Sequence, residues 1–501
     1  RRRIVVHITD IGREAISELE EPSPARRGRS FGPLPEQISL HGRDEDTTSL
    51  SDSLLAGSNV LLSGLPGVGK SSLARAVAEQ VLSMGWTVRW ASCGSDTDAA
   101  GVGKMWLGEG APSSSSAIIG ASDGPRTLLV LDEAQELHPR HATGMAELLD
   151  EASPGSSSVL AVSRSPSPFG LPEGFSEFKL EGLALKHARS LLPSDTDSAT
   201  ARSVAEALGG HPLALHLWLP GEEVPELGKA VQEYVESTVM HRLSDEGTET
   251  LDEFCISPSS LLVSELFEGE GANELDDSAI LRWSGVMAEP HHLIRNVRRG
   301  SWSDEQSNTL HAQAAGRWAT RQGARARRME GHHMVHSGEP DAEWVSEHIQ
   351  AIAEQDSAAA AVLLEQAVSL SEDESIREAA ADLALERGEA EIAESHIDGL
   401  SVGVGRKLRS ARLARLRGDP RSAEDIEASA MAEMTPAEHT KAAISSLVRR
   451  YDDRLPGRID RRLAQELTRA ADAVDVSSLP ESERSAGSLA LDLIRHGLAL
   501  E

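Results

Sequence analysis

The stretch Gly64–Ser71 constrains the fold of this chain more than any other. It reads Gly-Leu-Pro-Gly-Val-Gly-Lys-Ser, which matches the pattern G-x-x-x-x-G-K-[ST]. The apolar run 60–62 before it predicts a buried strand, and apolar residues at helical spacing follow it over 73–81. A strand, a glycine-rich loop and a helix in this order are typical of a phosphate-binding loop. A chance glycine-rich turn is the alternative.

The residue types of this loop suit a nucleoside triphosphate. Glycines let backbone N–H groups turn toward phosphate oxygens, and the helix N-terminus adds its partial positive charge. Lys70 is expected to reach the β- and γ-phosphates, and the Ser71 hydroxyl to ligate Mg²⁺. We therefore predict that ATP or ADP binds, with Mg²⁺, to Gly64, Pro66, Gly67, Val68, Gly69, Lys70, Ser71 and Ser72.

A second apolar run, 127–131, ends in two carboxylates, Asp132 and Glu133. A fully apolar run is typical of a strand in a parallel sheet that is covered on both faces, and ligands bind at the carboxyl ends of such strands. We expect Asp132 to hold Mg²⁺ through water and Glu133 to orient or deprotonate the attacking water. The alternative is that both residues cap the next helix.

Arg164 follows a further apolar run, 158–162, and is expected to emerge at the same sheet edge, where it could sense the γ-phosphate. A surface ion pair is the alternative. The predicted catalytic residues are thus Glu133, Asp132, Lys70 and Arg164. Residues 92–125 are rich in Gly, Ser and Asp, and we expect an exposed insertion with a short helix near 102–107.

Composition limits the class of protein. The 501 residues exceed one core, so several domains are expected. A net charge of −31 with only 7 Lys among 49 basic residues resembles proteins of salt-accumulating halophiles; an ordinary acidic cytosolic protein is the alternative. This charge opposes nucleic-acid binding over the whole surface but permits a local basic patch. Two cysteines, no apolar run of about 18 residues and no signal peptide predict a cytoplasmic protein without a membrane span.

The first 20 residues carry a resemblance of their own. Arg1, Arg2 and Arg3 precede a strand-like run, 4–8, and a helical pattern over 11–19. This resembles the wing strand and last helix of a MarR-type winged helix-turn-helix domain, which implies that the three arginines touch the DNA backbone. The recognition helix would precede residue 1, and because the first residue is not Met the sequence is expected to be truncated or processed there. A solvated strand–helix appendage is the alternative.

Five motifs resemble, in their order and spacing, the STAND class of signal-transduction ATPases, which includes NB-ARC proteins and large ATP-binding bacterial transcription regulators. They are His-Gly-Arg-Asp at 41–44, the phosphate loop, Leu-Leu-Val-Leu-Asp-Glu at 128–133, the strand ending at Arg164, and Gly-Gly-His-Pro-Leu-Ala-Leu at 209–215. The resemblance covers about residues 38–330. It implies that Pro212 packs on the adenine side and that Arg43 or its neighbours lie near the base and ribose.

The same resemblance implies that His291 reaches the β-phosphate of ADP. Pro290 and His292 depart from the family pattern, which has Met and Asp there. A histidine whose hydrogen bonds are satisfied within its own domain is the alternative for His291.

The predicted fold is an α/β P-loop NTPase, a parallel sheet with helices on both faces, followed by a helical lid, an interior winged helix and an all-α C-terminal region. The predicted boundaries are 1–21 for the end of the winged helix-turn-helix domain, 22–38 for a linker, 39–182 for the nucleotide-binding domain, 183–242 for the lid, 243–330 for the winged helix and 331–501 for a helical sensor. The segments 383–389 and 415–420 share a pattern at a spacing of 30, which favours a tetratricopeptide-like repeat; an irregular helical bundle is the alternative.

The predicted function is an ATP-binding switch with slow hydrolysis to ADP and phosphate, most readily a transcriptional regulator. A protein-interaction or defence scaffold without DNA output and a motor-like AAA+ ATPase are the alternatives. Its expected partners are nucleotide, DNA through the N-terminal domain, a protein or small-molecule signal on the C-terminal helices, and further copies of the chain in an ATP-dependent homo-oligomer.

Overall fold

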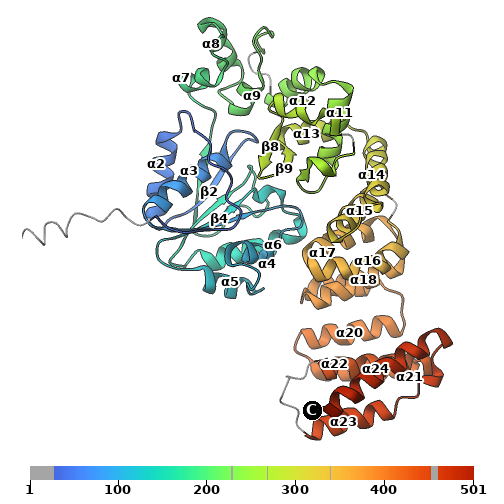
Figure 1. Ribbon diagram of the computed structural model, residues 1–501. Coiled ribbons are helices and arrows are strands. Elements are labelled where there is room, and N and C mark those ends of the chain that lie inside the picture. The colour runs from blue at the N-terminus through green and yellow to red at the C-terminus, as the bar shows by residue number, and fades with distance from the viewer. Residues whose placement is uncertain (1–26, 227–229, 268, 339, 453–460, 501) are drawn as a thin grey trace, which may run out of the picture. The chain divides into compact units, whose positions relative to one another are not determined.

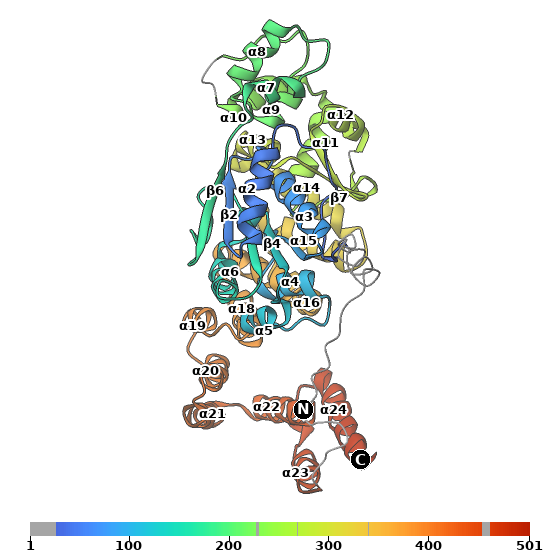
Figure 2. The ribbon, with the colours of Figure 1, turned by 90° about the vertical axis from the view of Figure 1, so that its left-hand side faces the viewer.

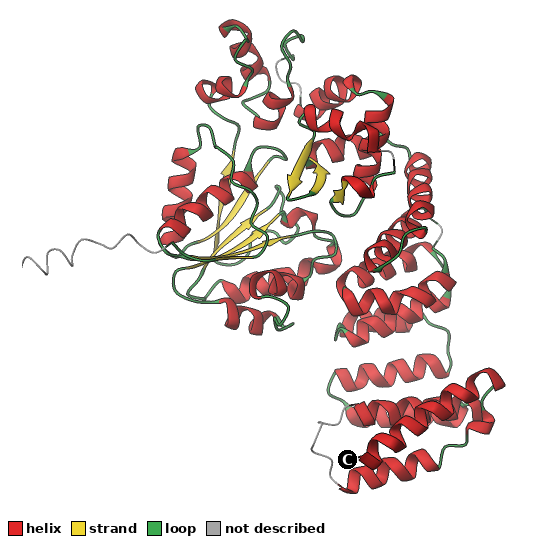
Figure 3. Cartoon of the chain, viewed as in Figure 1, coloured by secondary structure: helices red, strands yellow, loops and turns green. Residues whose placement is uncertain are grey.

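The computed structural model describes residues 27–226, 230–267, 269–338, 340–452 and 461–500. The chain divides into two compact units with the boundary after Ser371. Strands occur only in the first unit among these residues, in one large sheet and one small one, and the remainder is helical (Figure 3). In the same residues, no helix is long and apolar enough to cross a membrane.

A parallel sheet of six strands forms the base of the first unit. Its order is β1 (Ser30–Phe31), β3 (Thr87–Ser92), β4 (Thr127–Asp132), β5 (Ser158–Val162), β2 (Asn59–Gly64) and β6 (Phe175–Leu180). Figure 2 shows β2 and β6 side by side. Strand β5 lies between β2 and β4, so the residues after all three carboxyl ends meet at one edge of the sheet.

Helices cover both faces of this sheet (Figure 1). Helices α2 (Asp44–Leu55) and α3 (Lys70–Ser83) pack on one face, and α4 (Ala99–Leu107), α5 (Ser115–Ser122) and α6 (Pro139–Ala152) on the other. Strand residues alternate between the two cores: Leu128 and Val130 face α2 and α3, whereas Leu129 and Leu131 face α4–α6. The predicted α/β fold with helices on both faces is therefore confirmed.

The expectation of an exposed insertion over residues 92–125 is wrong. This segment forms α4 and α5, and the side chains of Val102, Trp106 and Ile118 are fully buried in the core beneath the sheet. The Trp106 indole N–H donates to the Val130 carbonyl at 3.1 Å. Gly and Ser lower helix propensity, but burial of these few large apolar side chains outweighs it.

One continuous hydrophobic core joins Leu183 to Met329 and contains mostly short elements. They are α7 (Leu185–Ala188), α8 (Ser198–Ala207), α9 (Pro212–Leu217), α10 (Val231–Tyr234), α11 (Asp245–Ile256), β7 (Leu261–Leu262), α12 (Ala272–Asp277), β8 (Leu281–Ser284), β9 (Met287–Pro290), α13 (His292–Gly300), α14 (Asp304–Ala319) and α15 (Ala324–His336). The strands form an antiparallel sheet of order β7-β9-β8. Helices α16 (Ala342–Gln355) and α17 (Ser357–Leu370) complete the first unit.

The second unit is all helical in its described residues. Its helices are α18 (Glu374–Glu386), α19 (Ala390–Asp398), α20 (Val404–Leu416), α21 (Pro420–Glu433), α22 (Pro436–Asp452), α23 (Arg461–Asp472) and α24 (Glu481–Leu500). The pairs α18–α19 and α20–α21 each turn at a left-handed glycine, Gly388 with φ +77° and Gly418 with φ +78°. These equivalent turns are the physical basis of the spacing of 30 residues seen in the sequence.

Candidate nucleotide-binding site

The phosphate-binding loop runs from the end of β2 to the start of α3. Gly67 and Gly69 have φ of +79° and +99°, in the left-handed region that favours glycine. A Cβ on Gly67 would lie 2.9 Å from the His211 ring, so this glycine allows a close approach of the later segment. A Cβ on Gly69 would meet nothing within 4 Å, which leaves open space at the N-terminus of α3, where a phosphate cradle is expected.

The Lys70 ammonium group is held against the loop itself. Its Nζ donates to the carbonyl oxygens of Gly64 and Leu65, both at 3.0 Å, and the residue is 8% exposed. Burial lowers the pKa of Lys70 to about 8, although Glu133 acts in the opposite direction. The lysine therefore lies at the loop. Exchange of its two loop carbonyl partners for phosphate oxygens would cost little free energy.

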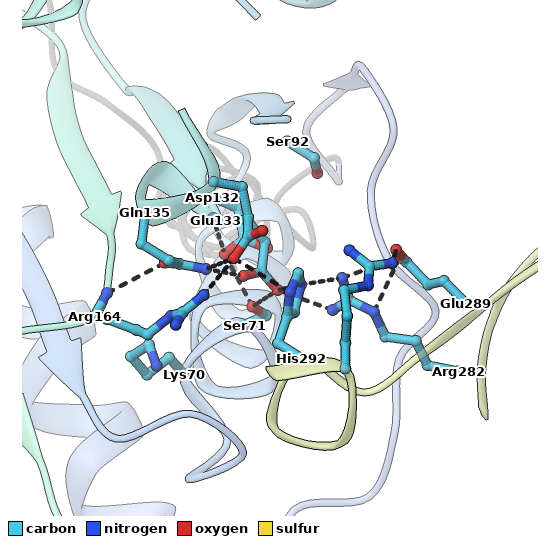
Figure 4. A network of polar contacts seen from close by, with 12 residues as sticks. Lys70, Ser71, Ser92, Asp132, Glu133, Gln135, Arg164, Arg282, Glu289 and His292 are labelled. Carbon is cyan, nitrogen blue, oxygen red and sulfur yellow. Dashed lines mark hydrogen bonds and ion pairs between the residues drawn. The ribbon is translucent and has the colours of Figure 1, made fainter. Parts of the chain in front are cut away.

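Ser71 and the two carboxylates after β4 come together (Figure 4). The Ser71 hydroxyl donates to Asp132 Oδ1 at 2.9 Å, and the Glu133 backbone N–H donates to the same oxygen at 2.9 Å. Burial, and next the charge of Glu133, raise the pKa of Asp132 to about 7. Glu133 itself has a left-handed backbone with φ +55°, which is uncommon for a residue other than glycine.

The Glu133 carboxylate is engaged by residues from a distant part of the chain. Arg282 on β8 donates to Glu133 Oε1 at 2.8 Å, and His292 Nε2 at the start of α13 lies 3.3 Å from the same oxygen. Gln135 donates to the other oxygen, Oε2. Burial alone would raise the pKa of Glu133, but His292 and Arg282 hold it well below its usual range.

A second carboxylate, Glu136, extends this network. The His292 ring bridges the two, because its Nδ1 lies 3.2 Å from Glu136 Oε1. Arg164 Nη2 pairs with the same Glu136 oxygen at 2.5 Å, and the Arg164 backbone N–H donates to Gln135 at 3.2 Å. Against the effect of burial, His292 and then Arg164 lower the pKa of Glu136 to about 2. Arg164 thus lies at the predicted sheet edge, but its guanidinium is paired with a carboxylate.

Arg43 and the segment around Pro212 both contact the phosphate-binding loop. Arg43 is 8% exposed and donates to the carbonyls of Glu181 at 2.6 Å and Val68 at 3.3 Å. Pro212 begins α9, and the preceding His211 places Nε2 2.8 Å from the Pro66 carbonyl. Because His211 Nδ1 accepts from the Ala214 N–H at 3.3 Å, Nε2 carries the proton and donates.

The structure brings His292, rather than His291, into contact with the acidic groups. His291 precedes α13, its backbone N–H donates to the Ile280 carbonyl at 3.0 Å, and burial lowers the pKa of its ring to about 4. Its predicted contact with ADP stays a prediction. Arg1, Arg2 and Arg3, predicted to contact DNA, lie outside the described residues.

The residues present fit a magnesium nucleotide. The open space at Gly69, a lysine bound only to loop carbonyls, and a serine hydroxyl beside a buried carboxylate are the donor set that phosphate and Mg²⁺ need. Lys70 and the loop would hold the phosphates, and Ser71 and Asp132 the ion. A bound nucleotide would supply the phosphoryl group to be transferred to water.

The parallel sheet, the phosphate-binding loop and the carboxylates at the end of β4 form a P-loop ATPase-like fold. A family model described as ATPase family associated with various cellular activities (AAA) matches residues 60–173, which include the phosphate-binding loop, β4 and Arg164. No curated protein matches the chain.

Among solved structures, the chain is similar to a signal transduction ATPase with numerous domains (STAND) protein with a tetratricopeptide repeat sensor from Pyrococcus horikoshii. That likeness has a TM-score of 0.58 and 14% identity, and it covers 93% of this chain and 76% of that chain. At this identity it concerns the fold. A RuvB variant from Thermotoga maritima matches with 15% identity over 52% of this chain and 96% of that chain, but its TM-score of 0.25 supports no structural conclusion.

Proposed function

We propose that this protein is an ATP-dependent switch whose resting form is held closed by a contact between the winged-helix segment, residues 243–330, and the catalytic carboxylate. The observation that carries the proposal is the pairing of Arg282 with Glu133 at 2.8 Å. Arg282 comes from β8, 149 residues along the chain, and Figure 4 shows it and His292 pointing at the carboxylates from their own segment.

This contact would suppress hydrolysis, because a general base needs a free oxygen and enough basicity. Both Glu133 oxygens have partners, Oε1 with Arg282 and His292 and Oε2 with Gln135. The same partners lower the pKa of Glu133, so its carboxylate is a poor acceptor for a proton from water. Separation of residues 243–330 from the sheet would restore both properties.

Two further ion pairs support a closed resting form. Arg328 on α15 pairs with Asp96 at 2.6 Å, and Arg140 on α6 pairs with Glu365 on α17 at 2.6 Å. The first joins the nucleotide-binding part to the end of the winged-helix segment, and the second joins it to a helix that follows this segment. We propose that a signal acting on the C-terminal helices, including those after residue 371, opens these contacts and that ATP stabilises the open form.

The roles of the site residues within this proposal follow from their positions. Lys70 and the loop residues 64–72 bind phosphate, Ser71 and Asp132 hold Mg²⁺, Glu133 activates water, and Arg164 senses the γ-phosphate once it leaves Glu136. Arg43 shapes the loop through the Val68 carbonyl, and Pro212 sets the start of α9 beside it. Hydrolysis is expected to be slow, because the closed form must first release Glu133.

We further propose the domain boundaries given above and a DNA-directed output. The order α11, β7, α12, β8, β9 supports a winged helix over residues 243–330, since a helix, a short strand, a helix and a hairpin follow each other as in that fold. Transcription as the output rests on Arg1, Arg2 and Arg3 in the sequence. Fluorescence anisotropy with random duplex DNA at two salt concentrations tests this output. If the chain with residues 1–26 and the chain without them give equal anisotropy, and salt does not change it, a scaffold without DNA output is favoured.

The switch itself is tested by identifying the nucleotide that co-purifies with the protein and then sizing the protein with ADP and with ATP in molar KCl. We expect bound ADP and a compact monomer in the first state, and an extended or assembled form in the second. Identical scattering in both states, or purification without nucleotide and without affinity for it, would contradict the proposal.

A further inference from the structure

Four histidines gather where α14 packs against α15, away from the nucleotide site. His311 lies on α14, and the other three, His332, His333 and His336, lie within little more than one turn of α15. His311 and His333 are 7% and 1% exposed, whereas His332 and His336 are half-buried. The cluster is therefore inside the helix pair but has two members that reach solvent.

The ring nitrogens of three of these residues converge. His311, His332 and His333 each offer one nitrogen, and these nitrogens all lie within 4.8 Å of one another. The Nδ1 atoms of His311 and His333 are 3.0 Å apart. In a tetrahedral Zn²⁺ site with Zn–N of about 2.0–2.1 Å, neighbouring ligand nitrogens are about 3.4 Å apart. Small rotations of the side chains would thus bring three ligands to one ion.

The fourth histidine is oriented beside these three. His336 Nδ1 lies 2.8 Å from the His332 carbonyl. When the His336 ring is neutral, its Nδ1–H donates to that carbonyl, and Nε2 is the nitrogen without a proton. A backbone carbonyl that fixes a ring in this way is the usual outer partner of a metal-bound histidine. The His336 ring stacks on His311 at 5.1 Å and lies 4.0 Å from the His332 ring centroid.

We propose that this cluster is a binding site for one divalent transition-metal ion of the Zn²⁺, Co²⁺ or Ni²⁺ class, with His311, His332 and His333 as ligands and His336 or water completing the coordination. Bound metal would cross-link α14 to α15, the helix pair at the end of the winged-helix segment that leads into α16 and α17.

The chemistry of the ligands selects this class of ion. Imidazole nitrogens suit borderline metals such as Zn²⁺ and Ni²⁺, whereas Mg²⁺ and Ca²⁺ require oxygen ligands, which the three residues do not offer. A neutral imidazole is the form that binds metal, and it is the main form of an ordinary histidine above about pH 6.5. The half-buried His332 and His336 provide access from solvent.

One nearby charge sets a limit on the affinity. Arg299 lowers the pKa of all four histidines, so its positive charge also opposes a cation. Its guanidinium is directed to the carbonyls of Cys255 at 2.6 Å and Ser257 at 3.4 Å. We therefore expect micromolar rather than picomolar binding.

The alternative to a metal site is an ordinary core in which the histidine rings pair with one another. A hydrogen bond between the His311 and His333 rings accounts for one nitrogen of each ring. A second group of possible ligands, Glu133, Glu136 and His292, belongs to the nucleotide site and is already paired with Arg282 and Arg164. The experiment must therefore distinguish metal bound at the histidine cluster from metal bound at the nucleotide site.

The experiment uses the full chain, stripped with a chelator and kept in millimolar Mg²⁺ and ADP so that the carboxylates of the nucleotide site hold a hard cation. Co²⁺ is titrated and followed by its visible absorption, and Zn²⁺ is then added against a chromophoric chelator. The variants are His311→Gln and His333→Gln. The matched control is His439→Gln, because His439 is exposed on α22 and outside the cluster.

We expect one equivalent of metal in the wild type and in His439→Gln, with the intense visible bands of four- or five-coordinate Co²⁺. Each cluster variant should bind at least about 100-fold more weakly, beyond the 10- to 100-fold loss seen when only an outer partner is removed. Zn²⁺ should also raise the thermal midpoint of the wild type by roughly 2–5 °C and leave both cluster variants unchanged.

Two results would overturn the inference. One is a wild type that binds no equivalent of Co²⁺ or Zn²⁺ at 100 µM, on the order of a hundred times the expected dissociation constant. The other is a weak, octahedral Co²⁺ spectrum that the cluster variants keep. If the variants fail to fold, the wild type alone decides the matter, because failure to bind one equivalent of Co²⁺ or Zn²⁺ excludes the site.

Discussion

Arg282→Ala should raise the basal ATPase rate, because Arg282 holds Glu133 in the closed form. Its bonds to Glu289 and His292 lie within residues 243–330 and persist in either form, so only the contact with Glu133 differs between the two states. A ligand or a side chain shifts an equilibrium only through such differential contacts.

The magnitude follows from the burial of the pair. The side chains of Arg282 and Glu133 are 32% and 15% exposed, so the pair is neither fully solvated nor fully buried. Exposed ion pairs contribute about 0.2–1 kcal/mol and hydrogen bonds to charged groups about 1.5–3 kcal/mol, which places this contact at about 1–2 kcal/mol. The open fraction, and with it kcat, should then rise about 5- to 30-fold while the closed form predominates.

Phosphate release at saturating Mg²⁺–ATP measures this effect. Arg298→Ala is the matched control, because Arg298 pairs with Asp252 inside the same segment and the two side chains are 22% and 15% exposed. The control removes an arginine of similar burial without touching Glu133. Equal rates in the two variants would refute the proposal that Arg282 holds Glu133 in the closed form. A rate in Arg282→Ala at least about tenfold below that of the wild type would make Arg282 a contributor to catalysis.

Four further predictions concern the same protein. Glu133→Gln should leave ATP binding intact and reduce hydrolysis by about 10²-fold or more, and a matching loss of affinity in an ATP titration would contradict its role as base. The pKa of Lys70 is lowered to about 8, and phosphate favours the charged form of this lysine. ATP affinity should therefore fall about tenfold per pH unit above pH 8, and Lys70→Arg should flatten this pH profile. His292→Ala should raise the basal ATPase rate, as Arg282→Ala does. His291→Ala should increase the rate of ADP release only if His291 touches the β-phosphate, and stopped-flow dissociation of a fluorescent ADP measures this rate. Finally, with a net charge of −31, the thermal midpoint should rise between about 0.1 and 2 M KCl, and a flat profile would argue against adaptation to high salt.

Local patterns predicted those parts of the site that depend on adjacent residues. The loop 64–71 contains its own glycines, lysine and serine, and the apolar run of β4 leads directly into Asp132, so the order of residues alone locates the strand, the loop and the carboxylates. The parallel sheet with its two covered faces followed from the same runs. The short helix expected near 102–107 is present as α4 (Ala99–Leu107). The expectation that 92–125 is exposed is wrong, because composition gives more weight to Gly and Ser than to Trp106 and Ile118, whose burial sets the fold there.

The residues that engage Glu133 left no comparable signal. Arg282 is one arginine in a short hairpin, and nothing within ten residues of it indicates a partner 149 positions earlier. His292 was visible only as a departure from the family pattern next to His291. Contacts between segments so far apart depend on how whole elements pack, and a linear pattern contains no information on that packing.

The two neighbouring carboxylates explain how movement of one segment could control chemistry. Asp132 is buried, Glu133 is half-buried, and the two carboxylates repel each other, so their protonation is coupled. In the closed form, against the effect of burial, His292 and Arg282 hold the pKa of Glu133 well below its usual range, while burial and then the charge of Glu133 raise the pKa of Asp132 to about 7. In the proposed mechanism, hydrolysis would require the reverse arrangement, an ionised Asp132 beside Ser71 to hold the cation and a more basic Glu133 facing water. Withdrawal of Arg282 and His292 removes the groups that keep the charge on Glu133, so opening would change the basicity of both carboxylates at once, even if neither of them moved.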